Sequence, residues 1–184
     1  MGLFIKKTGC TLGPSTNCRT QFAGDEEVPA CDVTLHSITL EKDAFNELLE
    51  DDEAHKNFYI GKGGIYEPRF RKLGPLSLPT KFEKCTVSFW FEGEDESLQL
   101  KTCKIKNIEL DRQTGGLTML KCQVQCLASG DQVALLYIHQ NKEASCSIRF
   151  GKEATKKQKE QPELPLDHGA DGEKEGGEDA AAVH

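Results

Sequence analysis

Apolar residues recur at every second position over much of this chain. Because successive side chains of a β-strand point to opposite faces, residues at i, i+2 and i+4 share one face. The pattern is clearest in Cys31-Val33-Leu35, Cys85-Val87-Phe89-Phe91, Cys103-Ile105, Cys122-Val124-Cys126 and Cys146-Ile148-Phe150. Short polar sequences that suit turns separate these runs. The pattern predicts strands near 30–40, 84–92, 97–111, 115–127, 133–139 and 144–150.

The stretch 97–111 is longer than an ordinary strand. Its apolar register shifts between Cys103-Ile105 and Ile108-Leu110, which predicts a β-bulge near Lys106-Asn107. Strands joined by consecutive short turns favour an antiparallel sheet. The predicted fold class is therefore mainly β (α+β), an antiparallel β-sandwich or barrel-like meander with one main helix.

That helix is predicted over 41–50, where the apolar residues follow a helical spacing instead. Ala44, Phe45, Leu48 and Leu49 form a single stripe at i, i+1, i+4 and i+5. A second short turn of helix is expected over 53–58.

Two segments carry no clear periodicity. Residues 1–30 are rich in glycine, proline and small polar residues, so we expect a turn-rich N-terminal segment after a short strand at 3–7. Residues 59–80 contain a glycine cluster and three later prolines, and are expected to form a long loop. Because loops of this length often carry function, 59–80 is the first candidate for a binding surface.

The composition changes after residue 151. The β-rich domain is expected to cover 1–151, with a net charge of −3, and residues 152–184 add a further −4. This last segment has few large apolar residues and many Pro, Gly, Asp and Glu. It cannot bury enough apolar area to offset the entropy lost on ordering, so we predict a disordered acidic C-terminal tail.

The eight cysteines bear on the compartment. Six of them occupy apolar positions of the predicted strands, where a thiol packs as a small hydrophobic group. The chain has no apolar run long enough for a membrane helix, and the apolar stretch at its start is too short for a signal peptide. We therefore expect a cytoplasmic protein with reduced cysteines and no membrane partner. Four disulfides are the alternative that the even number leaves open.

The sequence favours no enzyme and no cofactor. No cysteine, histidine, acidic or glycine-rich segment matches a catalytic, calcium-binding or phosphate-binding pattern. Zinc is the alternative at Cys10, Cys18 and Cys31. Cys122 and Cys126 have suitable spacing, but on a strand they would lie roughly 13 Å apart, too far for one tetrahedral ion.

Binding is the remaining class of function. Aromatic and basic side chains interleave around the long connection and on two strands, and the candidate binding residues are Tyr66, Arg69, Phe70, Arg71, Lys72, Trp90, Lys104 and Lys106. Stacking aromatics beside a basic groove are typical of single-stranded nucleic-acid binders. Because the domain is net negative, where nucleic-acid binders usually carry a basic excess, a protein partner is the first interpretation and nucleic acid the alternative. The sequence leaves the oligomeric state open.

One stretch resembles a known group of proteins. The chain around 32–58 and 98–126 resembles small uncharacterised proteins of tailed phages and prophages, above all in the residues from Cys103 to Cys126, CKIKNIELDRQTGGLTMLKCQVQC. The resemblance covers about half of the chain and contains no functional motif. It implies a phage accessory protein acting in a bacterial cytoplasm, and assigns no residue a role.

Overall fold

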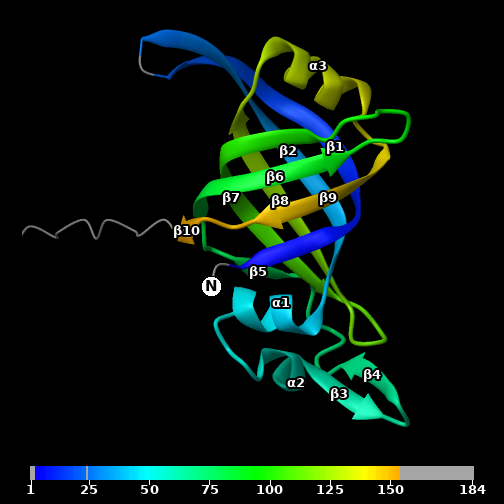
Figure 1. Ribbon diagram of the computed structural model, residues 1–184. Coiled ribbons are helices and arrows are strands. Elements are labelled where there is room, and N and C mark those ends of the chain that lie inside the picture. The colour runs from blue at the N-terminus through cyan, green and yellow to red at the C-terminus, as the bar shows by residue number, and fades with distance from the viewer. Residues whose placement is uncertain (1–2, 24, 154–184) are drawn as a thin grey trace, which may run out of the picture.

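The computed structural model describes residues 3–23 and 25–153. Its main body is a closed antiparallel β-barrel (Figure 1). The strands pair in the order β1 (Phe4–Ala23), β2 (Glu26–Leu40), β8 (Thr118–Leu127), β7 (Leu98–Arg112), β6 (Phe82–Trp90) and β9 (Glu143–Arg149). Strand β9 pairs with β1, which closes the ring and confirms the barrel-like prediction.

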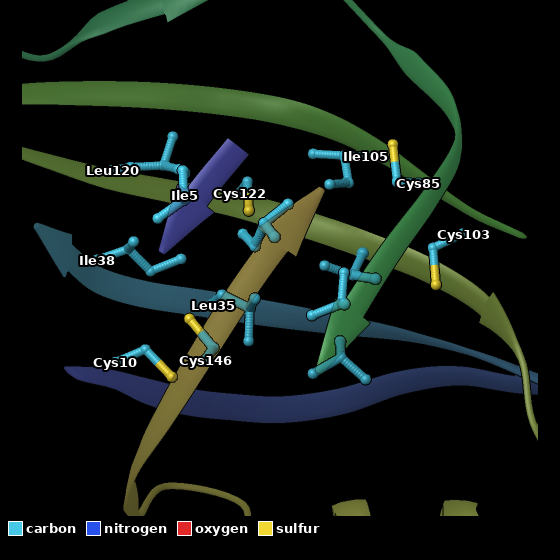
Figure 2. Packing of buried hydrophobic residues seen from close by; sticks show 14 of the residues in the cluster. Ile5, Cys10, Leu35, Ile38, Cys85, Cys103, Ile105, Leu120, Cys122 and Cys146 are labelled. Carbon is cyan, nitrogen blue, oxygen red and sulfur yellow. The ribbon is translucent and has the colours of Figure 1, made fainter. Parts of the chain in front are cut away.

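The interior of the barrel holds the residues that the period-two pattern assigns to one face. In β8, every second side chain from Thr118 to Cys126 is buried, and the side chains between them are partly exposed. Figure 2 shows cysteines packed among isoleucines and leucines from several strands. All eight cysteines are free thiols, and all but Cys18 are buried. The six cysteines at apolar strand positions are therefore packing residues as predicted, and Cys10, which lies outside that pattern, is buried as well.

Bulges bend the long strands around the barrel. The predicted irregularity near Lys106-Asn107 is confirmed, because the register of β7 and β8 shifts between Lys106 and Glu109 and Asn107 has φ of 53°. Ser37, Lys84 and Thr102 also have positive φ, and each lies at a register shift. A bulge adds local twist and bend, which lets long strands curve into a closed sheet.

Helices lie at the two ends of the barrel (Figure 1). Helix α3 (Gly130–Ile138) lies at one end. Helices α1 (Lys42–Leu48) and α2 (Ala54–Phe58) lie at the other, and are followed by a hairpin of β3 (Tyr59–Lys62) and β4 (Ile65–Pro68). Two short strands extend the sheet: β5 (Leu76–Leu78) pairs with β7, and β10 (Lys152–Glu153) pairs with β6.

Four sequence predictions differ from this architecture. The predicted strand at 133–139 is wrong, because these residues belong to α3 and its C-cap. The expected turn-rich segment at 1–30 consists mostly of β1 and the start of β2, and the expected long loop at 59–80 contains β3, β4 and β5. Lys152 and Glu153, placed in the predicted tail, form β10. The rest of that tail lies outside the described residues.

In the part of the chain that the structure covers, no helix has both the length and the apolar character needed to cross a membrane.

Candidate functional site

The hairpin of β3 and β4 and the turn after it expose an unusual amount of apolar surface. Ile60, Ile65, Tyr66, Phe70 and Leu73 are between 46% and 62% exposed. These five make up half of the large hydrophobic residues that are exposed in the described chain. We call residues 60–73 the hairpin surface. Exposed apolar side chains concentrated in one short segment mark a candidate interaction site.

The hairpin surface is also basic. It contains Lys62, Arg69, Arg71 and Lys72 against a single acidic residue, Glu67, so its net charge is +3 in a chain of net charge −7. A groove of about 660 Å³ runs over it, lined by Ile60, Lys62 and residues 67–73. Arg71 forms an ion pair with Glu67 at 2.5 Å, and Arg69 donates a hydrogen bond to the Lys56 carbonyl.

Hydrogen bonds to the β7–β8 turn hold the hairpin against the barrel. Tyr59 Oη donates to the Leu117 carbonyl at 2.6 Å and accepts from Thr118 Oγ1 at 2.8 Å. The Gly115 amide donates to the Tyr66 carbonyl at 2.7 Å. Because a carbonyl can only accept, the 3.0 Å contact of His55 Nε2 with the Gly116 oxygen places the imidazole proton on Nε2.

The packing at this junction is close. The His55 ring stacks on Tyr59 with a centroid separation of 4.6 Å, and Tyr66 meets His55 edge-on. Gly116 has φ of +79°, and a Cβ there would lie 3.0 Å from the Tyr66 Cβ. Only glycine suits such a backbone next to an aromatic side chain.

Arg112 secures the other end of the hairpin surface. Its guanidinium donates to the carbonyls of Leu73 and Gly74 at 3.1 and 2.9 Å and lies over the Phe58 ring. The hairpin surface is therefore held in place at both ends, and a surface fixed in this way loses less entropy in any binding event.

The structure brings together five of the eight residues predicted for binding, namely Tyr66, Arg69, Phe70, Arg71 and Lys72, which all belong to the hairpin surface. Lys104 and Lys106 lie instead on β7, where they pair with Glu83 at 2.9 Å and Asp32 at 3.3 Å. Trp90, on β6, lies under the Lys7 ammonium, 4.6 Å from the ring centroid. These three residues are part of the barrel wall.

The sequence interpretation missed the aliphatic part of this surface. Ile60, Ile65 and Leu73 were given no role, although large aliphatic residues in a glycine-rich connection were an available signal. Arg112 was also missed, and Tyr59 was given no role in anchoring the hairpin. Their partners are carbonyls distant in the sequence, so no local pattern marks them.

A larger groove of about 1010 Å³ lies between α1 and the barrel. Its rim includes Asp43, Glu47, Glu50 and Asp52, and its apolar lining includes Leu78 and Phe82. Helix α1, which borders this acidic groove, and the β3–β4 hairpin lie toward the same end of the barrel (Figure 1). The two surfaces therefore carry opposite charge at one end of the barrel.

Most of the thiols are buried, and in the described part of the chain they do not gather around a metal site. Among residues 3–23 and 25–153, no three His, Cys, Asp or Glu side chains are placed to hold a metal ion. The trio considered for zinc is divided, since Cys10 and Cys31 are buried and Cys18 is exposed. Burial raises the pKa of Cys103 and of Cys122 to about 12, so both are protonated at neutral pH.

Comparison of the chain with models of protein families, with curated proteins and with solved structures finds no match.

Proposed function

We propose that this chain is a non-enzymatic binding protein that engages a protein partner through the hairpin surface. The observation that carries the proposal is that one segment, held in place by hydrogen bonds, contains five exposed apolar residues, Ile60, Ile65, Tyr66, Phe70 and Leu73. In line with the resemblance noted in the sequence, we propose a phage-encoded accessory role in a bacterial cytoplasm.

The chemistry of the surface points to the chemistry of the partner. Apolar side chains surrounded by four cations complement a segment that carries large apolar residues flanked by carboxylates. Large apolar and aromatic anchors supply most of the affinity in protein interfaces, and rim charges mainly orient the partner.

A random peptide library displayed on cells tests this directly. We expect the wild-type protein to enrich peptides that combine Leu, Phe or Trp with Asp or Glu. A variant with Phe70→Ser and Leu73→Ser should lose this enrichment while keeping its denaturation midpoint, because the side chains are 49% and 62% exposed.

The matched control is Tyr137→Ser with Ile138→Ser on α3, since these exposed residues lie at the other end of the barrel. It should enrich the same peptides as the wild type. Enrichment of basic peptides, or equal loss in both variants, would contradict the proposal.

Single-stranded nucleic acid is the second candidate, favoured by the half-exposed Tyr66 and Phe70 beside Arg69, Arg71 and Lys72. The aliphatic residues on the same surface, and the engagement of Lys104 and Lys106 in ion pairs, favour a protein instead. A gel shift with single-stranded DNA at two salt concentrations separates the two. Binding through phosphates must weaken steeply as salt rises.

A further inference from the structure

The cysteines inside the barrel fall into pairs on neighbouring strands. Cys31 and Cys126 lie directly opposite each other on β2 and β8, and Cys85 and Cys103 lie directly opposite on β6 and β7. Cys10 on β1 lies one diagonal step from Cys146 on β9, because their direct partners are Ala144 and Thr8.

These pairs differ in how close they are to disulfide geometry. The Sγ atoms of Cys31 and Cys126 are 3.6 Å apart. Directly opposite residues of an antiparallel pair have Cα atoms about 4.5–5.5 Å apart, within the range that a disulfide spans. A disulfide could therefore form if the two sulfurs moved toward each other, with no change of strand pairing.

The other two pairs are less suitable. Figure 2 shows the sulfurs of Cys85 and Cys103 directed away from each other. The Cys85 sulfur accepts a hydrogen bond from the Gly151 amide, and the Cys103 thiol donates to the Lys101 carbonyl. Residues on a diagonal, as Cys10 and Cys146 are, have Cα atoms about 7–8 Å apart, beyond the usual reach of a disulfide.

Cys31 and Cys126 are 0% and 2% exposed, so a reagent reaches them only when the sheet opens locally. Their rung is followed by the last pair of the β2–β8 ladder, Ala30 with Leu127. On the other side of β2, the register with β1 shifts between Thr16 and Arg19, so that two residues of β1 lie opposite Cys31 alone. The end of a ladder beside a bulge opens at lower cost than the middle of a sheet.

We propose that Cys31 and Cys126 form a site of reversible disulfide modification, oxidised by a low-molecular-weight disulfide such as glutathione disulfide. The Cys31 thiolate attacks one sulfur of glutathione disulfide, which breaks that S–S bond and releases one glutathione. The Cys126 thiolate then attacks Cys31 Sγ and releases the second glutathione. The two protein thiols are oxidised, their protons go to the two glutathiones, and one disulfide is reduced.

The electrostatics of the pair fit these two roles. The hydrogen bond from Cys126 lowers the pKa of the Cys31 thiol, and that same bond together with burial raises the pKa of Cys126. Cys31 is therefore the first thiol to ionise and the attacking group. The resulting bond would join β2 to β8 inside the barrel, away from the hairpin surface, so this proposal is independent of the proposed function.

The test is oxidation of the full chain with glutathione disulfide, followed by acid quenching, alkylation of the remaining thiols and tryptic mapping. A Cys18→Ser background removes the exposed thiol. We expect the peptide of residues 20–42, whose only cysteine is Cys31, to be joined to the peptide of residues 122–142. The intact mass should fall by that of two hydrogen atoms, and dithiothreitol should restore it.

Because the second peptide contains both Cys122 and Cys126, two variants identify the partner. Cys122→Ala should keep the cross-link and Cys126→Ala should lose it. The proposal would be overturned if every buried thiol were still alkylated after the folded protein had been exposed to glutathione disulfide. A cross-link that survives Cys126→Ala would also overturn it. Mapping of the Cys18→Ser chain shows whether the cross-link forms, even where a variant at Cys122 or Cys126 fails to fold.

Discussion

At the scale of single residues, the junction between the barrel and the hairpin depends on a few buried polar groups. Tyr59 is 2% exposed, and its hydroxyl connects Leu117 and Thr118 of the β7–β8 region to β3. Thr118 is itself buried. Loss of such a hydroxyl leaves buried partners without a hydrogen bond, which costs more than the bond itself contributes.

Tyr59→Phe should therefore destabilise the fold by about 1–2 kcal/mol, measured as a shift of the urea midpoint. Tyr137→Phe is the control, because Tyr137 is largely exposed and should shift stability by less than about 0.5 kcal/mol. Equal effects of the two substitutions would contradict the role given to the Tyr59 hydroxyl.

The same residue gives an expected pH dependence. Burial raises the pKa of the Tyr59 phenol above its ordinary value of about 10. The folded state thus favours the neutral phenol. Its contribution to the free energy of unfolding is fully present below about pH 10 and is lost as the pH rises through the folded-state pKa. Unfolding midpoints measured from neutral to alkaline pH should fall less steeply in Tyr59→Phe.

At the scale of elements, α3 shows how a local signal can be overlooked. Residues 133–139 are mostly apolar, which suited a short buried strand as well as a helix. The deciding signal was the capping box, in which the Ser129 hydroxyl accepts from the Gln132 amide and the Gln132 side chain accepts from the Ser129 amide.

Ser129→Ala should destabilise the protein by about 1 kcal/mol, because amides of the first turn lose their acceptor. Ser129→Asp should restore most of that loss, since a carboxylate also caps the amides and interacts favourably with the helix dipole. Thermal denaturation of the three proteins checks the order. An unchanged midpoint in Ser129→Ala would show that tertiary contacts alone hold α3.

In strand β1, glycine and proline predicted turns, but in the structure they lie at bulges within one long strand. Gly13 and Pro14 lie at the register shift between Leu12 and Ser15, where the ladder with β2 is interrupted. Proline and glycine are tolerated at bulges, where a ladder hydrogen bond is already missing. Periodicity alone could not distinguish a bulged strand of 20 residues from a series of turns.

At the scale of the whole molecule, one carboxylate connects four strands of the barrel wall. Asp32 on β2 is 2% exposed and accepts contacts from Arg19 on β1, Lys106 on β7 and Gln123 on β8 at 3.3–3.4 Å. A buried carboxylate requires partners of this kind, since moving a charged group from water into the protein interior is costly.

Asp32→Ala should destabilise the barrel by about 2–4 kcal/mol, because Arg19 and Lys106 lose an acceptor at a partly buried site. Glu109→Ala is the matched control, since its ion pair with Lys121 is half exposed and such pairs contribute about 0–1 kcal/mol. Urea denaturation compares the two. A loss in Asp32→Ala no larger than in Glu109→Ala would show that the cluster is no anchor.

The alternating pattern by itself determined which face of most strands is apolar, that the cysteines of β2, β6, β7, β8 and β9 lie inside, and where β7 bulges. Side-chain direction in a strand depends only on the local backbone, so neighbouring residues carry this information. Closure of β9 onto β1, the gathering of five binding candidates on the hairpin surface, and the use of Lys106 by Asp32 depended on tertiary structure. These contacts join residues that are distant in the sequence, and their partners are chosen by how the barrel closes.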